Sequence, residues 1–535
     1  MMHYEPTMLA IGSERQLFVD DLLIETVHEI TRTFHRPTKT EQSPIIVKDK
    51  PWEKVTYFSG GAWNVFRDPE DGLFKCLYSD YRLDRDDWKA SGGLSLKNHM
   101  LTVNYAVSKD GIRWKKPSLG LLHENGQDTN IVFGNGAVES GAAYSFCPVH
   151  NPHEPDPDKR LRTLYWAWND RRGMHQHVAF SPDAIHWTIS EQPLNFGSAP
   201  GIGDVLIADY NPKTRLYVAS VRHHFMSDVQ FNPRNPKGRG FLAFEPYYPL
   251  DFSKSPKRMV WQIESGDFIH WSEPHLILAP VDGVDNIDDE FYGMAQYPLG
   301  SLRLGFLNVF HKTLNTMDVQ LVYTRDGYQW HRLNKCQPLL EPGLPGSWDQ
   351  YMTTIVSQPI EVGDKLYIYH GGSQSHHDWW MSGPLEGLDV PEVHDFSKVG
   401  YGLGLAQLRL DGFASLDASA VREGILVTRP FLSTGNRLII NADVREGGYI
   451  DVEATDGADE IIPGRSRDAC DTCVGDSVRH EVTWRGDSHL PLGKSNRFRK
   501  LRFFMHKADL YSFQMFHPER HLDDTKYPGT GWQTA

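Results

Sequence analysis

The chain has no long hydrophobic run. No stretch of about 18 apolar residues occurs in its 535 residues, so a membrane-spanning helix is not expected. Residues 1–15 also lack a basic segment followed by an apolar one, which is the pattern of a secretory signal. These two absences predict a cytoplasmic protein with no membrane partner.

Positive charge is scarce. The chain carries 55 Lys and Arg residues against 69 Asp and Glu residues, which gives a formal net charge of −14. No run of lysine or arginine interrupts this acidic balance. Because such a surface repels a phosphate backbone, nucleic acid is not an expected partner.

Cysteine is sparse as well, with five residues in the whole chain. Cys470 and Cys473 have the spacing of half a zinc site, but no second pair with suitable spacing follows them. We therefore expect reduced cysteines in a loop, no metal ion and no cofactor.

Aromatic residues are abundant, at 12% of the chain, with 15 Trp and 22 Tyr. Large rings suit the packed blades of a β-propeller, and they also suit the faces of sugar rings. The length is enough for two or three domains with a large core. Long helical periodicity is absent, so the composition and patterning favour an all-β protein.

A seven-residue pattern recurs four times. It reads Ser-Lys-Asp-Gly-Ile-Arg-Trp at residues 108–114, and related segments occupy residues 181–187, 265–271 and 324–330. The tryptophans are 73, 84 and 59 residues apart, which indicates a structural period with variable insertions. Ser or Thr and Asp close tight turns by bonding to the backbone, and glycine permits a positive φ. The pattern predicts hairpin turns and resembles the Asp-box turns of sialidase propellers, one residue shorter.

Five pairs of β-type segments accompany these turns. The pairs are residues 62–67 with 73–78, 142–148 with 163–168, 205–210 with 216–221, 292–297 with 302–310, and 352–359 with 365–370. With residues 402–410 as a closing segment, they predict a five-bladed β-propeller over residues 1–412. Within it, residues 1–50 are expected to pack on the propeller or close it.

A second domain is expected after the propeller. Residues 438–443, 449–454, 477–484, 501–505 and 510–515 have the character of short strands. They predict a C-terminal β-sandwich and tail over residues 413–535. The sequence leaves open whether this domain only braces the propeller or binds sugar itself.

Three segments carry a resemblance to a known family. They are Leu-Phe-Val-Asp-Asp at residues 17–21, the stretch 105–120 around the first heptad, and Gly-Leu-Gly-Leu-Ala-Gln-Leu-Arg-Leu-Asp-Gly-Phe at residues 402–413. They resemble bacterial proteins similar to the N-terminal domain of glycoside hydrolase family 32, in the five-bladed superfamily that includes families 43, 68 and 130. The resemblance implies a propeller that acts on carbohydrate. It does not imply fructosidase activity, because the Trp-Met-Asn-Asp-Pro-Asn-Gly nucleophile motif and the Glu-Cys pair are missing, and Arg67-Asp68-Pro69 is expected in an ordinary turn.

Carboxylates stand where the innermost strands of the blades are expected to start. Since those starts surround the central funnel of a propeller, Glu139, Asp204, Glu290 and Asp349 are expected to meet there. Glycoside hydrolysis needs one protonated and one ionised carboxyl group. We therefore expect Asp204, Glu290 and Asp349 to be catalytic, with Glu290 as the acid, Asp204 as its partner and Asp349 orienting substrate or water.

Other polar and aromatic residues are expected to bind the substrate. Arg and His at the ends of the second strands are good donors to sugar hydroxyls, and a tryptophan can serve as a sugar platform. This set comprises Arg222, His223, His311, His370, Trp348, Asp289, Glu53 and Glu139. His376 and His377 lie in a Gly/Ser-rich loop that is expected over the funnel mouth.

Several functions are compatible with this pattern. The first is a glycoside hydrolase with paired carboxylates in the funnel. A glycoside phosphorylase would need a phosphate cradle, for which Arg222, His223 and His311 are the available residues, and a polysaccharide lyase would need a His or Tyr base with Arg facing a uronate. A sugar-binding propeller without catalysis is the remaining alternative. In each case the expected partner is an oligosaccharide or glycoside, and the sequence leaves a homo-oligomer open.

Overall fold

The computed structural model describes residues 9–82, 101–134, 143–169, 173–197, 202–222, 258–281, 283–380, 389–492 and 497–517. This part of the chain is almost all β, which confirms the predicted class. α3 (Pro391–His394) is a short α-helix. The described residues contain no helix with the length and apolar character needed to cross a membrane.

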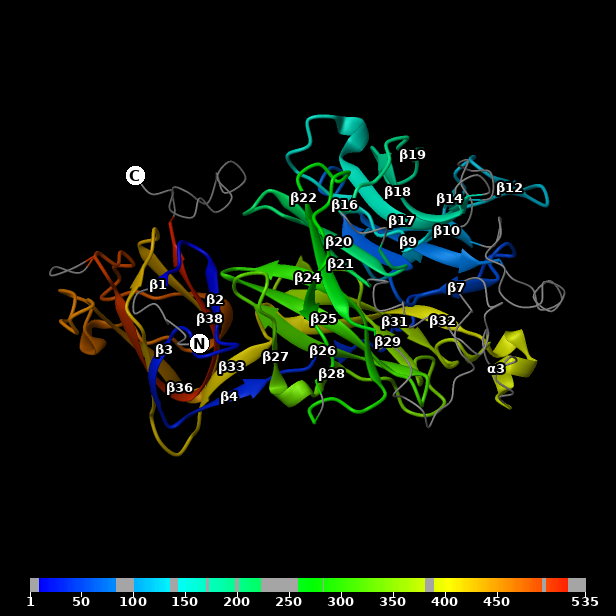
Figure 1. The fold of residues 1–535 in the computed structure, drawn as a ribbon. Helices are drawn as coiled ribbons and strands as arrows, with labels where there is room; N and C mark the ends of the chain where they lie inside the picture. Colours follow the sequence, from blue (N-terminus) through cyan, green and yellow to red (C-terminus); the bar gives the residue numbers. More distant parts are fainter. Residues whose placement is uncertain are drawn as a thin grey trace.

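The first two sheets follow one another along the chain (Figure 1). The first contains β7 (Val55–Tyr57), β8 (Trp63–Arg67), β9 (Phe74–Tyr81), β10 (Leu101–Ser108), β11 (Trp114–Lys115) and β14 (Ile131–Phe133). The second contains β15 (Ala143–Tyr144), β16 (Val149–His150), β17 (Leu161–Asn169), β18 (Gly173–Ser181) and β19 (Thr188–Ile189). Their long strands pair antiparallel in chain order, so each sheet is a meander.

The next strands form a third sheet and a larger one. The third sheet is β20 (Leu206–Asn211), β21 (Leu216–Val221), β22 (Val260–Ser265) and β23 (His275–Leu278), in that order. The larger sheet begins with β24 (Asp289–Leu299), β25 (Leu302–His311), β26 (Thr316–Thr324), β27 (His331–Arg332) and β28 (Pro338–Leu340). It continues with β29 (Met352–Thr354), β30 (Ile360–Val362), β31 (Lys365–Ser373) and β32 (Tyr401–Arg409). A single parallel pair, Met317 with Met352, joins these two groups of strands.

The N-terminal segment contributes to three different sheets, the smallest of which is the parallel pair of β1 (Leu9–Ala10) with β35 (Phe431–Leu432). β5 (Thr38–Lys39) and β6 (Ile46–Val47) pair antiparallel with β32, so the start of the chain completes the last group of strands. The strands before them, β2 (Arg15–Leu17), β3 (Ile24–His28) and β4 (Ile30–Phe34), pair instead with strands of the C-terminal region. The first 50 residues therefore connect the two regions.

The four heptads form the same turn, as the sequence predicts. In the first turn, the backbone N–H groups of Ile112 and Arg113 donate to Asp110 Oδ1 at 2.9 and 2.8 Å, and Gly111 N–H donates to Ser108 Oγ at 2.9 Å. The same bonds recur in the turns at residues 181–187, 265–271 and 324–330. Each turn connects two neighbouring strands at one edge of its sheet.

The C-terminal strands form an eight-stranded sheet with the N-terminal ones. β33 (Ala414–Ala418), β34 (Gly424–Thr428), β36 (Arg437–Thr455), β37 (Gly475–Glu481) and β38 (Lys500–Phe516) join β2, β3 and β4. Figure 1 shows these orange, red and blue strands together in one lobe. Segments that the sequence suggests as separate strands are continuous in β36 and β38, because β-bulges interrupt the register without ending the pairing.

Two buried apolar clusters match this division. The larger one includes Trp63, Phe306 and Trp380, which are less than 1% exposed, and it extends across the first sheet and the eleven-stranded sheet. The second includes Trp484, Phe503 and residues of β36 and β38. The apolar faces of the strands are buried in these clusters. Polar side chains stand at the ends of the strands, and the candidate site lies there.

Candidate functional site

Asp204 and Arg222 form an ion pair at one end of the third sheet. Asp204 lies just before β20 and Arg222 directly follows β21, where the Arg222 N–H donates to the Val205 carbonyl at 3.2 Å. A Cβ on Gly203 would lie 1.9 Å from the Arg222 carbonyl oxygen, so this close approach requires glycine. Asp204 is fully buried. The Arg222 guanidinium carbon lies 4.9 Å from the centroid of the Tyr292 ring, within range of a cation–π contact.

Glu290 forms a second charged group on β24, the first strand of the eleven-stranded sheet. Its carboxylate is 2.7 Å from Arg258 Nη1 and 3.4 Å from Lys312 Nζ, and the residue is only 4% exposed. The Arg258 guanidinium carbon lies 5.2 Å from the Tyr292 ring centroid. Two arginines from neighbouring strands therefore converge on one tyrosine, each with a buried carboxylate.

Tyr292 owes its orientation to a bulge. The register of β24 against β25 shifts between Phe291 and Gly293, and the Tyr292 hydroxyl lies 3.0 Å from His377 Nε2. His377 is 2% exposed, and its Nδ1 lies 3.4 Å from Ser59 Oγ. Burial, with Arg258 and Arg222 adding to it, holds the pKa of His377 well below its usual value. The imidazole is therefore neutral at neutral pH.

Asp378 brings a third carboxyl group to this place. Asn315 Nδ2 donates to its Oδ1 at 2.5 Å, and the Asp378 N–H donates to Asn315 Oδ1 at 2.9 Å. The His377 N–H donates to the Asn315 carbonyl at 3.0 Å. Burial raises the pKa of Asp378, although the Asn315 hydrogen bond and the nearby Arg258 oppose this shift. Burial of Asp378 therefore favours its protonated form.

These groups define what we call the Tyr292 cluster. Its members come from the ends of strands in different sheets and share partly or fully buried positions around one ring. They are Asp204, Arg222, Arg258, Glu290, Tyr292, Lys312, His377 and Asp378. Of the residues predicted from the sequence, the structure brings Asp204, Glu290, Arg222 and the loop residue His377 into this cluster.

Asp289 and His311 lie beside the cluster and are paired with each other. His311 Nδ1 is 2.7 Å from Asp289 Oδ1, and its Nε2 is 2.9 Å from Asp318 Oδ2. Burial alone would lower the pKa of His311, but the two carboxylates outweigh it and raise the pKa to about 10. The ring is an imidazolium held between two acids at neutral pH. It can orient them, but it has no lone pair with which to act as a base.

Asp349, Trp348 and His370 gather elsewhere. Asp349 accepts hydrogen bonds from Lys39 Nζ at 2.5 Å and Ser347 Oγ at 3.0 Å, and the Trp348 ring lies 5.5 Å from that of His370. His370 is fully buried, and burial together with Lys39 lowers its pKa to about 3. Among the described residues, no hydrogen bond or ion pair connects this group to the Tyr292 cluster.

Glu53 is also placed apart. Its carboxylate accepts from the Tyr78 hydroxyl at 2.6 Å and from Lys116 Nζ at 2.7 Å, and the residue is 1% exposed. Near it, burial raises the pKa of Asp80 to about 7 despite two hydrogen bonds from the Lys54 N–H. Glu139 and His223, the two remaining predicted residues, lie outside the described residues.

Sequence reasoning missed several members of the cluster. Arg258, Tyr292 and Lys312 lie one to three residues from a strand boundary, Asp378 lies five residues after the end of β31, and no motif sets them apart. The nearest signal is Glu290, since Tyr292 follows it by two residues on β24. Only the packing of strand ends and loops in the folded chain reveals that these side chains meet.

No metal site accompanies the cluster in the part of the chain that the structure describes. There, no group of three or more His, Cys, Asp or Glu side chains is arranged to hold a metal ion. Cys470 and Cys473 are both free thiols.

Comparisons with known proteins give matches only at the level of structure. No protein-family profile and no curated protein sequence matches the chain. A glycosyl hydrolase from Bacteroides ovatus is 16% identical, with a TM-score of 0.43, over 74% of this chain and 97% of that one. A β-1,2-mannobiose phosphorylase from Listeria innocua is 11% identical, with a TM-score of 0.42, over 71% and 97%. An N-acetylgalactosamine deacetylase from F. plautii is 12% identical, with a TM-score of 0.43, over 71% and 96%.

Glycoside hydrolases and mannoside phosphorylases, the group that the sequence resembles, are thus among the structural neighbours of this chain. The deacetylase shows that the neighbours do not share one reaction. At TM-scores below 0.5, the chemistry of this chain must be argued from its own residues.

Proposed function

We propose that the chain is a carbohydrate-active enzyme built on a five-bladed β-propeller with a C-terminal β-sandwich. The first three sheets, the β24–β28 group and the β29–β32 group closed by β5 and β6 supply the five blades. The eight-stranded sheet supplies the sandwich, to which residues 15–34 also contribute, so this domain is more than residues 413–535. The repeated heptad turn in four of the groups supports the blade assignment.

The proposed activity is hydrolysis of a glycosidic bond at the Tyr292 cluster. The observation that carries it is the presence of two ion-paired carboxylates, Asp204 and Glu290, together with Asp378, a carboxyl group whose pKa is raised. A glycosidase needs a proton donor and an ionised base or nucleophile, and these three groups supply both forms. The ion pairs change the roles expected from the sequence, because Glu290 is paired with Arg258 and the raised pKa belongs to Asp378.

In this mechanism Asp378 protonates the oxygen of the departing sugar. Glu290, held by Arg258, activates a water molecule or attacks the anomeric carbon. Asp204 and Arg222 hydrogen-bond the hydroxyl groups of the sugar ring and fix its position against Tyr292. His377, being neutral, orients the Tyr292 hydroxyl.

Substrates with different leaving groups test whether Asp378 is the proton donor. We expect Asp378→Asn to lower turnover on an alkyl glycoside by about 10²–10⁴, because the alkoxide cannot leave without a proton. On a nitrophenyl glycoside the same variant should keep most of its activity, since a nitrophenolate leaves unassisted. Rates on matched pairs of alkyl and nitrophenyl glycosides measure the difference. Equal losses on both substrates would remove Asp378 as the acid.

A phosphorylase is the second candidate. It is favoured by the two guanidinium groups of Arg222 and Arg258 at the Tyr292 ring, since guanidinium groups bind phosphate bidentately. Lys312 adds a third positive charge, 3.4 Å from the second carboxylate oxygen of Glu290. In that case turnover should require inorganic phosphate, and the product should be a sugar 1-phosphate instead of a free sugar. Product analysis with and without phosphate decides between the two reactions.

A further inference from the structure

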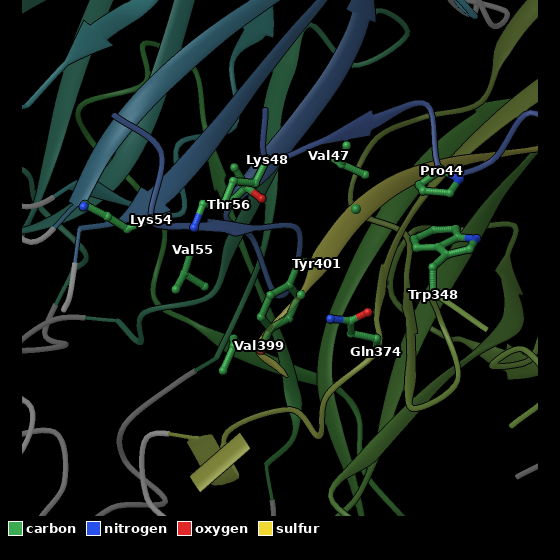
Figure 2. A pocket seen from close by; sticks show the side chains of 12 residues that line it. Pro44, Val47, Lys48, Lys54, Val55, Thr56, Trp348, Gln374, Val399 and Tyr401 are labelled. Atoms are coloured by element: carbon green, nitrogen blue, oxygen red, sulfur yellow. The ribbon is translucent and has the colours of Figure 1, made fainter. Parts of the chain in front are cut away.

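A cavity lies where β32 meets β6 and β7. It has a volume of about 190 Å³, and its lining includes Trp348, Tyr401, Thr56, Gln374, Lys48 and Lys54. Figure 2 shows Trp348 and Pro44 on one side of it and Lys48, Lys54 and Thr56 on the other. We call it the Trp348 cavity.

Glycines give the indole ring of Trp348 a flat support. A Cβ on Gly372 would lie 2.4 Å from the ring, one on Gly404 2.8 Å from it, and one on Gly402 3.3 Å from it. These three glycines belong to β31 and β32, whose pairing places Gly372 opposite Gly402. The ring therefore rests directly on backbone, and its position is fixed before any ligand arrives. A fixed aromatic face costs little conformational entropy on binding.

The opposite wall is positively charged. Lys48 and Lys54 are both exposed, and within the described ranges neither forms an ion pair. Two such lysines beside one cavity stand out in a chain with a net charge of −14. Gln374, also exposed, adds an amide to the same lining. Lysine ammonium groups bind anionic oxygens as compact charges, so this wall is suited to a negatively charged substituent.

We propose that the Trp348 cavity binds one anionic sugar residue. The sugar ring lies against the indole of Trp348, and its carboxylate or sulfate group faces Lys48 and Lys54. The cavity is smaller than the roughly 300–1,000 Å³ of sites for drug-sized ligands, which limits it to about one ring. Tyr401 in the lining donates its hydroxyl to the His377 carbonyl at 2.8 Å, so the cavity adjoins the Tyr292 cluster. It would hold a second unit of a polysaccharide or recruit one, whatever reaction the cluster performs.

Calorimetric titration with three trisaccharides tests this site. The probes are trigalacturonate, a sulfated galactotriose and unmodified galactotriose. We expect at least one anionic probe to bind about 10-fold or more tightly than the neutral one, and to weaken as the salt concentration rises from 50 to 500 mM. Binding by the first probe identifies a carboxylate ligand, and binding by the second identifies a sulfate.

Variants locate the binding site. Lys48→Ala and Lys54→Ala should each weaken binding of the anionic probe about 5- to 20-fold, and Trp348→Ala about 10-fold or more. Lys109→Ala removes an exposed lysine outside the cavity and should have no effect. Thermal melting checks that Trp348→Ala is folded, and the two surface lysine variants keep the test valid if it is not.

Three results would overturn the proposal. The first is equal or tighter binding of galactotriose, or no binding of any probe. The second is a loss in Lys109→Ala as large as that in Lys48→Ala. The third is binding that Arg222→Ala abolishes while the Lys48 and Lys54 variants retain it, which would place the anion at the Tyr292 cluster.

Discussion

Asp204 and Asp267 stand at opposite ends of the third sheet. Asp267, in the heptad turn, accepts from the N–H groups of Ile269 and His270 at 2.9 and 2.8 Å, and its side chain is 54% exposed. Partial burial would raise its pKa, but the His270 side chain and these N–H groups lower it to about 2. Asp204 is fully buried and pairs with Arg222, which lies 18 residues further along the chain.

Asp267 has hydrogen-bond partners within its own heptad, whereas the partner of Asp204 is distant along the chain. A turn aspartate is satisfied by the backbone of its own heptad, so its place follows from seven residues of sequence. Asp204 and Glu290, at the start of their strands, form ion pairs with guanidinium groups, and the position of each guanidinium group depends on other strands. We expect substitutions at the first kind of position to change stability and those at the second kind to change catalysis.

The largest expected effect separates these two roles. Glu290→Gln keeps the size of the side chain but removes the negative charge opposite Arg258, so turnover on a competent glycoside should fall about 10²–10⁴-fold. Initial rates over a range of substrate concentrations measure kcat and KM separately. Asp326→Asn, an acid in the fourth turn, is the matched control and should leave kcat unchanged. Wild-type turnover in Glu290→Gln would rule out the assigned role.

A smaller catalytic effect should follow from Asn315→Gly. Asn315 has a φ of 53° and is 4% exposed, so glycine keeps the backbone shape while the amide that holds Asp378 is lost. We expect turnover to fall about 10-fold. The pH–rate profile gives a sharper readout, because a protonated Asp378 is required and activity is lost as the pH rises through its pKa. Removing the Asn315 donor raises that pKa, so the basic limb should move to higher pH. If the basic limb of the pH–rate profile does not move, Asn315 has only a structural role.

Asp267→Ala should act on stability alone. It removes the acceptor of two backbone N–H groups, a loss that costs about 1–2 kcal/mol in comparable capping positions. Urea denaturation measures the difference in the free energy of unfolding. Because the folded-state pKa is lowered, the contribution of this carboxylate is present above its ordinary pKa and is lost as the pH falls towards about 2. The difference in the free energy of unfolding between the wild type and Asp267→Ala should therefore become smaller as the pH falls.

The same contrast explains what the sequence could predict. The all-β class and the four turns were predictable, because strand periodicity and the Ser-Asp-Trp heptad act over a few residues. Asp204 and Glu290 were predictable as the start of apolar strands, but Arg258 and Asp378 were not. Arg258 pairs with Glu290 of another sheet, and Asp378 pairs with Asn315, which stands 63 residues earlier in the chain, so no local pattern encodes either contact.

The second turn gives the smallest expected effect. It is one of two turns that have a residue other than glycine with a positive φ at this position, and the other residue is Phe268, with a φ of 71°. Ala184 adopts a φ of 72° where the equivalent residues Gly111 and Gly327 have φ values of 75° and 84°. Ala184→Gly should relieve about 1–2 kcal/mol of left-handed strain. It also loses the burial of one methyl group, about 0.8 kcal/mol, and adds about 0.4–1 kcal/mol of unfolded-state entropy. These contributions offset one another, so the free energy of unfolding should change by less than about 1 kcal/mol.

Gly327→Ala is the reciprocal of this change. A Cβ there would meet nothing within 4 Å, so neither packing nor a clash accompanies the strain. We expect it to destabilise the protein by about 1 kcal/mol, and paired urea denaturation of the two variants checks both values. A loss above about 2 kcal/mol in Ala184→Gly would mean that the buried methyl group, rather than the backbone bonds of the turn, holds the second heptad in place. The heptads would then not be equivalent, and the aspartates of the turns could not be treated as one class.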